Sequence, residues 1–431
     1  MRAIFLILLS FGFGFSAKAE VSGRIHFQED DFYNSQVEPI DHLQDTLSLE
    51  IESKNKLTDS LRLLIEPRLV ISTLRDQVDA PLDYNTRDTL LDFKLGDEHL
   101  QIGTFIKQWE GPDGFNPMDI TTVKDYRDPF ATESLASAGI NFFGGEKKFT
   151  YDALFVPWQT PTRLPGDQSR WLPRKTPFPL VSGQNTLLVP QQPVLDVQSH
   201  QFVNDALRNN FGARIGFHGD AWDLSLAGYQ GAAQLPIFKV HIVGDLVTTQ
   251  PDGTNVIQIR NPIQLQPLEY LRRSFAAGYV STLSDTWVFR AAGRYDQPVG
   301  NDPLLPGPSD QFVGGFEKTF TINEQTVMFS LQYAYAKILD SPTGVLNITD
   351  PFQNAILYGM RFPVREDFVL YYMGIWSHQI GATYNRLKLE KKLAEAVTLE
   401  LGFDLIRGPS DNLLGIWSDE CRASLGLLYQ F

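Results

Sequence analysis

Apolar and polar residues alternate in short stretches along most of this chain. In one such stretch, Leu47, Leu49 and Ile51 alternate with Ser48 and Glu50. Because successive side chains of a β-strand point to opposite faces, this pattern predicts strands with one apolar and one polar face. We expect such strands at residues 22–28, 46–52, 60–69, 89–95, 100–106, 136–142, 149–156, 211–217, 222–229, 273–281, 287–295, 312–320, 327–335, 355–362, 368–375, 383–390, 397–405 and 421–431.

The connections between the expected strands alternate in length. The short ones are residues 54–59, 96–98, 144–148, 219–220, 283–285, 322–324, 364–366 and 393–395. The long ones are residues 29–42, 72–85, 107–133, 157–209, 231–272, 296–310 and 338–354, and only 377–381 breaks the order. This asymmetry predicts an all-β fold, a transmembrane antiparallel β-barrel of roughly 18 strands (about 16 to 18) with short periplasmic turns and long extracellular loops.

The N-terminus has the pattern of a secretion signal. A positive start is followed by an apolar run at residues 3–15, and small residues in a cleavage pattern precede Glu20. The run is shorter than the roughly 20 residues that a membrane-spanning helix needs. We therefore predict a signal peptide at residues 1–19 and a single outer-membrane barrel domain at residues 20–431.

The C-terminus has the pattern of a closing barrel strand. Residues 421–431 alternate apolar with polar or small residues and end on the aromatic Phe431. This ending resembles the signal that the bacterial outer-membrane assembly machinery reads. We therefore expect the Gram-negative outer membrane as the location, with membrane lipids and the assembly machinery as partners.

Composition fits a barrel and excludes several other classes of protein. Aromatic residues make up 12% of the chain, yet the mean hydropathy is −0.17, because apolar side chains are spread between polar ones. The net charge of −14 argues against nucleic acid as a partner. The sequence has no Cys/His metal cluster, phosphate-binding loop or dinucleotide motif, so we expect neither a metal nor a cofactor.

Charged residues recur on the polar faces of the expected strands. If the apolar face meets lipid, these residues line the lumen, where they either set ion selectivity or brace the wall as salt bridges. Among them, Arg62, Arg68, Arg290 and Arg294 form a predicted stripe that attracts anions. The candidate pore-lining residues are Arg62, Arg68, Arg214, Arg290, Arg294, Arg386, Glu50, Glu66, Asp92 and Glu400.

The long connection at residues 107–133 carries the most distinctive motif. It reads Trp109-Glu-Gly-Pro-Asp-Gly-Phe-Asn-Pro-Met-Asp119, in which Gly and Pro require turns and the Asp and Asn side chains can cap backbone amides. We expect either a constriction folded into the lumen or a purely structural loop. The candidate constriction residues are Trp109, Asp113, Asn116, Pro117, Asp119, Arg127 and Asp128.

This motif resembles a segment found in a set of outer-membrane β-barrel proteins, largely of unassigned substrate. Those proteins carry a related Trp-Gly, Asp and Asn-Pro pattern after an early hairpin. The present chain departs from it, because Glu110 separates Trp109 from Gly111. The resemblance implies an outer-membrane, channel-like protein and no particular substrate.

A second long connection, at residues 157–209, is rich in Pro and also contains Trp158, Trp171 and several Arg residues. Proline disfavours both helix and strand pairing, but such a segment can still be held rigidly. It is expected either to fold over the mouth of the barrel or to lie exposed on the surface.

These patterns predict a porin-like channel for passive or facilitated diffusion of small hydrophilic solutes, and not an enzyme. One alternative is a surface-binding or structural barrel with an occluded lumen. A barrel enzyme is the other, but it needs a Ser/His or Asp/His constellation, and the 7 His residues lie apart from any such motif. A monomer and a homo-oligomer are both compatible with the sequence.

Overall fold

The computed structural model describes most of the chain. The described residues are 19–33, 42–73, 82–166, 169–172, 185–188, 190, 194–203, 205–303, 305–322, 324–339, 352–409 and 413–431. The predicted signal peptide, residues 1–19, lies outside them except for Ala19. Within the described ranges, no helix is long and apolar enough to cross a membrane.

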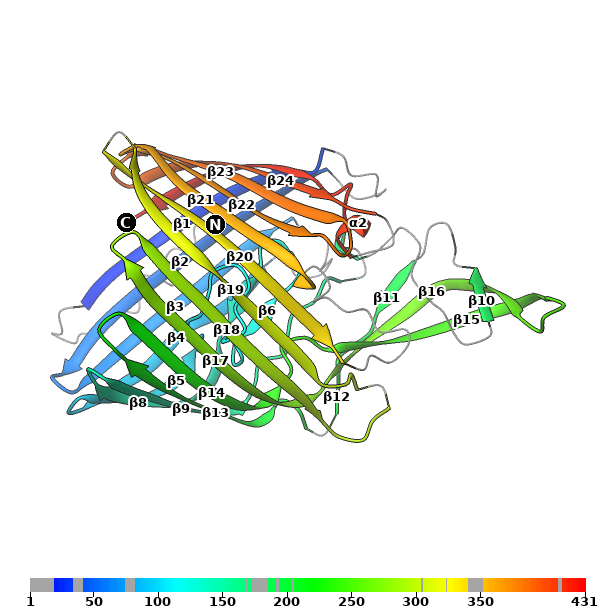
Figure 1. Cartoon of the computed structure of the whole chain (residues 1–431), viewed down its shortest axis with the longest axis horizontal. Helices are drawn as coiled ribbons and strands as arrows, with labels where there is room; N and C mark the ends of the chain where they lie inside the picture. The colour runs from blue at the N-terminus through cyan, green and yellow to red at the C-terminus, as the bar shows by residue number, and fades with distance from the viewer. Residues whose placement is uncertain are drawn as a thin grey trace, which may run out of the picture.

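An 18-stranded antiparallel sheet closes on itself to form a barrel (Figure 1). Its strands, in order around the ring, are β1 (Ala19–Asp31), β2 (Leu43–Thr58), β3 (Leu61–Ser72), β4 (Leu82–Leu95), β5 (Glu98–Phe105), β8 (Ser137–Glu146), β9 (Phe149–Trp158), β13 (Arg208–His218), β14 (Trp222–Ala232), β17 (Leu271–Ser284), β18 (Trp287–Val299), β19 (Ser309–Ile322), β20 (Gln325–Ile338), β21 (Ala355–Arg365), β22 (Phe368–Ser377), β23 (Ala382–Ala394), β24 (Val397–Arg407) and β25 (Arg422–Gln430). The predicted fold class is confirmed.

The last strand closes the ring by pairing with the first. Phe27 of β1 lies opposite Leu427 of β25 in an antiparallel register. The backbones of Gly23 and Phe431 exchange two hydrogen bonds, of 2.9 and 3.0 Å, at the end of this seam. The C-terminal alternation therefore belongs to a closing strand, as predicted.

The outer face of the barrel is apolar. On β25, for example, Leu425, Leu427 and Tyr429 point outward and are exposed, as are Phe275 of β17 and Phe312 of β19. Monomeric soluble proteins rarely expose apolar surface on this scale, whereas a bilayer covers it. The chain is therefore an integral protein of the Gram-negative outer membrane.

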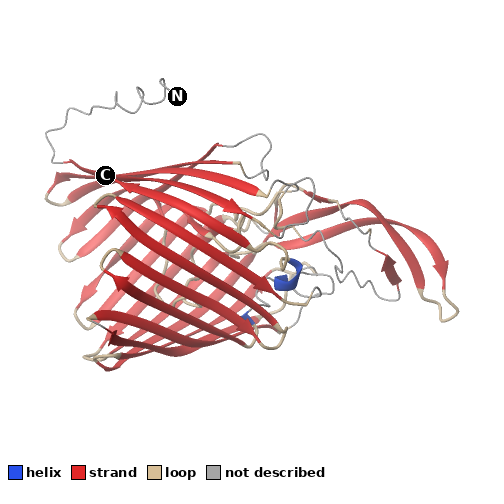
Figure 2. Cartoon of the chain, turned by 90° about the horizontal axis from the view of Figure 1, so that it is seen from above, coloured by secondary structure: helices blue, strands red, loops and turns tan. Residues whose placement is uncertain are grey.

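A second sheet projects from the barrel as an arm (Figure 2). Its hairpin consists of β15 (Ile237–Thr249) and β16 (Asn255–Glu269), and three short strands pair parallel with β16. Those short strands are β10 (Asn185–Leu188), β11 (Leu195–Val197) and β12 (Gln201–Phe202). The long connections at residues 157–209 and 231–272 therefore contain strands that are not among those predicted. In the second, apolar residues flank a turn at residues 250–254 that contains Asp252-Gly253, and they form a hairpin.

Residues 107–135, which we call the strap, lie inside the barrel (Figure 1). The strap contains the two-stranded sheet of β6 (Val123–Asp125) and β7 (Glu133–Leu135). Its apolar side chains Trp109, Met118 and Ile120 are buried against the lumen face of the wall. The residues that receive them there are mostly small or aliphatic: Ala227, Ala276, Ala292, Val313, Ala334 and Leu357.

Glycines in the wall make room for the strap. A Cβ on Gly278 of β17 would lie 3.0 Å from Met118, and one on Gly212 of β13 would lie 3.1 Å from the Trp109 ring. These separations are tighter than ordinary packing allows. The sequence of the wall is thus fitted to an inward-folded strap.

Candidate functional site

One end of the strap is held by three side chains of the barrel and its rim. Gln234 Nε2 donates to the carbonyl oxygen of Asp119 at 2.6 Å, and Arg294 Nη1 donates to the same oxygen at 3.3 Å. Arg272 Nη2 donates to the carbonyl oxygen of Ile120 at 3.0 Å. Buried carbonyl groups need such partners, so these donors fix the strap against β17 and β18.

A buried carboxylate organises the two arginines. Asp296 accepts a hydrogen bond from Arg272 Nη1 at 2.7 Å and lies 2.9 Å from Arg294 Nε. Ser274 Oγ donates to it at 2.5 Å. Since these groups are almost fully buried, the carboxylate offsets two guanidinium charges that would otherwise repel each other. We call Gln234, Arg272, Arg294 and Asp296 the clamp.

The other end of the strap reaches the opposite side of the lumen. There it meets β4, β3 and β25 through ion pairs, and charge-assisted hydrogen bonds of this kind are stronger than neutral ones. The strap therefore crosses the lumen from wall to wall. The three pairs are Arg127–Asp83, Glu133–Arg68 and Asp128–Arg422.

Local caps shape the strap on either side of the point where the clamp holds it. Asn116 Nδ2 donates to the carbonyl oxygen of Trp109 at 3.0 Å, and Asn116 Oδ1 accepts from the Met118 amide at 2.9 Å. Asp128 Oδ1 accepts from the Phe130 amide at 2.9 Å. These are the turn-stabilising contacts expected from the motif.

The remaining candidate constriction residues also belong to the strap. Pro117 and Asp119 are buried, whereas Asp113 is exposed. Burial opposes the charge of Arg127, but its hydrogen bonds to Asp125 and Asp83 outweigh this and raise its pKa above the ordinary value. The seven candidates thus come together in one segment inside the barrel, and their role in passage stays a prediction.

The register places all ten candidate pore-lining residues on the lumen face of their strands. Most of them form ion pairs or close charged contacts with lumen neighbours. Of the ten candidates, Arg62 and Arg214 form no ion pair with any residue that the structure describes. The paired ones are Arg68–Glu50, Glu66–Arg87, Asp92–His99, Arg290–Glu317, Arg294–Asp296, Arg386–Asp404 and Glu400–Lys388.

The four arginines of the predicted stripe do not lie together, and attraction of anions by either pair stays a prediction. Arg62 and Arg68 lie on β3, which pairs with β2 and β4, whereas Arg290 and Arg294 lie on β18, which pairs with β17 and β19. The two pairs of arginines are on opposite sides of the ring, and Arg294 is committed to the clamp. Arginine spacing along a strand does not show which arginines share a side of a closed ring.

The lumen wall formed by β1 to β4 carries charged side chains that are accessible to solvent. Glu50 of β2 lies among three arginines, 2.6 Å from Arg24, 2.9 Å from Arg68 and 3.4 Å from Arg87. The side chains of Arg24 and Arg87 keep 47% and 31% of their surface exposed, and that of Lys388 keeps 35%. Water therefore reaches the charges on this side of the lumen.

An aromatic cluster sits at the mouth of the barrel. Phe130 of the strap packs against Trp171, Tyr384 and Trp417, with ring centroids 4.7 to 5.5 Å apart. Trp171 belongs to the Pro-rich connection, so this part of it folds into the mouth rather than lying exposed. Much of that connection, including residues 173–184, lies outside the described residues.

Several residues of the site were not among the candidates from the sequence. Arg272 and Asp296 each continue the polar face of their strand. Asp296 is two positions from Arg294, so the alternation of the sequence could have identified it as a lumen-facing residue. Gln234 lies in a connection without periodicity and gives no such signal. Arg24 and Arg87 face the lumen with Glu50, and only the pairing of β1 to β4 brings them together.

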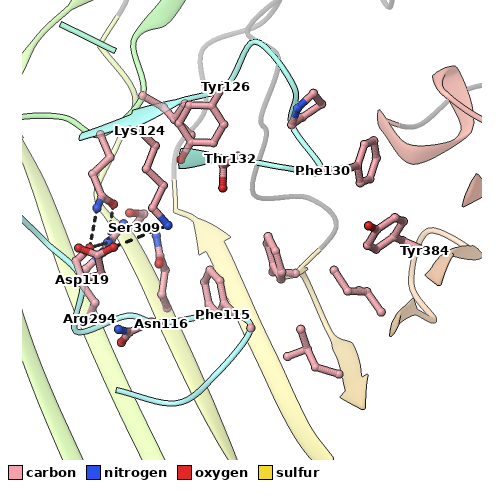
Figure 3. A pocket seen from close by; sticks show the side chains of 18 of the residues that line it. Phe115, Asn116, Asp119, Lys124, Tyr126, Phe130, Thr132, Arg294, Ser309 and Tyr384 are labelled. Atoms are coloured by element: carbon pink, nitrogen blue, oxygen red, sulfur yellow. Dashed lines mark hydrogen bonds and ion pairs between the residues drawn. The ribbon is translucent and has the colours of Figure 1, made fainter. Parts of the chain in front are cut away.

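A cavity of about 500 Å³ lies between the strap and the wall from β17 to β23. Figure 3 shows Asp119, Lys124 and Arg294 at one end of it and Phe130 and Tyr384 at the other. The cavity is thus polar at one end and aromatic at the other.

No protein-family model and no curated protein matches the chain in sequence. Among solved structures, Acinetobacter baumannii OccAB3 matches with a TM-score of 0.53 and 11% identity, covering 96% of this chain and 99% of that one. A loop-deletion mutant of OmpT, an outer membrane protein of Vibrio cholerae, has a TM-score of 0.44 and 11% identity, covering 97% and 100%. A mutant of the Rh. blastica porin has a TM-score of 0.41 and 11% identity, covering 96% and 100%.

Identities this low show shared fold alone, and of these three matches the one to OccAB3 has a TM-score above 0.5. It extends over nearly the whole of both chains. The chain therefore has the fold of the outer-membrane, porin-like β-barrels.

Proposed function

We propose that the chain is a porin-like channel through which small hydrophilic solutes cross the outer membrane by passive or facilitated diffusion. The observation that carries this proposal is the charged wall of β1 to β4, whose arginines keep part of their surface in contact with water inside the barrel. A closed barrel of this strand number is wide enough to hold an aqueous lumen.

In this proposal the strap is the constriction. It crosses the lumen from β17 and β18 to β3, β4 and β25 and so reduces the bore. Solutes pass beside the strap along the charged wall, where charges of both signs favour polar and hydrated molecules. No catalytic group or cofactor is required.

The occluded barrel is the second candidate function. The burial of Trp171 and Trp417 at the mouth favours it, because two connections besides the strap fold inward there. Such a barrel would present its arm and loops to a partner and would pass no solute.

Planar-bilayer recording of the purified full-length barrel separates the two functions. Reproducible open-channel steps, together with swelling of barrel-containing vesicles in small sugars but not in large ones, support the channel. A silent bilayer at every salt concentration and voltage overturns the channel and favours the occluded barrel.

Two further proposals concern partners. Assembly into the membrane through the closing strand that ends at Phe431 is one, and homo-oligomer formation is the other. A lower yield of folded barrel after truncation of Phe431 would support the first, and the mass of the detergent-solubilised protein would test the second.

A further inference from the structure

The cavity beside the strap has the size of a small-molecule site. Its volume of about 500 Å³ falls within the roughly 300 to 1,000 Å³ that such sites occupy. It opens between the strap and the lumen wall, next to the proposed path of solutes.

Aromatic rings line the cavity in two places, with Phe115 beside Asn116 and with Phe130 and Tyr384 at the far end (Figure 3). Phe115 of the strap stacks on Phe352, with ring centroids 4.5 Å apart, and Phe130 lies 4.7 Å from Tyr384 and 5.5 Å from Trp417. Flat rings of this kind offer their faces to the C–H face of a ligand ring.

Apolar side chains such as Leu357, Met373 and Ile375 line much of the rest of it. Uncharged polar side chains lie among them: Asn116, Gln234, Ser309, Gln311, Ser330 and Gln332. Two acceptors that border the cavity, Asp119 Oδ2 and Gln332 Oε1, are buried and receive no hydrogen bond from any described residue. The nearest cation to Asp119 is Lys124, whose Nζ lies 3.6 Å away. A buried acceptor without a donor is unfavourable, so a ligand hydroxyl that displaces the side chains covering these two oxygens would satisfy them.

The formal charges around the cavity cancel. Its described lining holds three acidic groups and three basic ones: Asp113, Asp119, Asp296, Lys124, Arg272 and Arg294. The two arginines are occupied by Asp296 and by the strap backbone. The lining therefore favours neither an anion nor a cation.

We propose that this cavity binds a neutral ring that carries several hydroxyl groups, that is, a small sugar. The aromatic end covers one face of the ring, and hydroxyl groups donate to Asp119 and Gln332 at the other end. The inference rests on the proposed channel function, for which it names a substrate class.

The test is equilibrium binding to the full-length barrel in detergent, measured by calorimetry and by the intrinsic tryptophan fluorescence, to which Trp417 beside the cavity contributes. The probes are glucose and maltose, with benzoate as an aromatic anion and choline as a cation. The variants Phe115→Leu and Gln332→Met remove one contact at each end, and Gln297→Met, on the outer face, is the matched control. Heat-modifiable mobility on gels shows that each variant is folded.

Saturable binding of a neutral sugar that weakens at least tenfold in Phe115→Leu or Gln332→Met, and is unchanged in Gln297→Met, is expected. Binding of benzoate or choline without sugar binding overturns the inference, as does sugar binding that both variants leave unchanged. A barrel that conducts but binds no sugar overturns the inference alone. A barrel that binds sugar but never conducts overturns the proposed channel function, while the proposed sugar site stands.

Discussion

At the scale of single residues, Asp296 is the key charge inside the barrel. It faces Arg272 and Arg294, and those two arginines hold the backbone of the strap. Removing one partner from a buried group of charges is more costly than removing the whole group, because the remaining charges lose their compensation.

We therefore expect Asp296→Asn to destabilise the barrel. Two buried guanidinium groups would face each other without a counter-charge, and the free energy of unfolding should fall by about 3 to 5 kcal/mol. Urea unfolding, followed by heat-modifiable gel mobility, measures this. Asp310→Asn, on the outer face of the adjacent strand, is the control and should shift stability by less than about 0.5 kcal/mol. Equal stability of both variants would contradict the role of the clamp.

The wall glycines make a second prediction at this scale. Gly278 faces Met118 of the strap, whereas a Cβ on Gly228 of β14 would meet nothing within 4 Å. Gly278→Val should therefore cost about 1 to 3 kcal/mol of stability through overpacking. Gly228→Val, the matched control, should be neutral in the same urea titration. A neutral Gly278→Val would mean that the strap does not rest on this wall.

At the scale of elements, all 18 barrel strands lie where the alternation of the sequence predicts them. This succeeds because lipid on one side and water on the other impose a period of two on every strand. The alternation does not predict the arm for a related reason, because the strands of the arm lie outside the membrane within a long connection. The Asp252-Gly253 turn between apolar stretches was the available signal.

The interior of the barrel was less predictable. The motif at residues 107–133 indicates a structured segment, yet its partners Arg68, Asp83 and Arg422 come from strands far away in the sequence. The alternation shows that these side chains face the lumen. Only the closed ring shows that they lie on the same side of it, where the strap reaches them.

The arm should be separable from the barrel. β14 and β17 pair directly up to Ala232 and Leu271, so the chain enters and leaves the arm at neighbouring points of the wall. Replacing residues 240–266 with a short Gly-Ser turn should leave the unfolding free energy within about 1 kcal/mol of the intact protein. Loss of heat-modifiable mobility in the shortened protein would show instead that the arm is part of the barrel's core.

At the scale of the whole molecule, two unlike halves face each other across the lumen. The wall from β13 to β21 carries small and apolar side chains where the strap rests on it. The wall from β1 to β4 carries charged side chains that are accessible to solvent. The strap joins the two. This division gives the barrel a polar path beside a fixed constriction, which is the basis of the proposed channel.

Single-channel conductance of the intact barrel, recorded beside Asp296→Asn under the same conditions, tests this account most directly. The intact barrel should give small, reproducible steps. The variant, whose strap has lost its clamp, should give larger and noisier ones if it inserts folded. Silence from both folded proteins at every salt concentration and voltage would contradict the account, since a barrel with a water-filled path beside its strap must conduct.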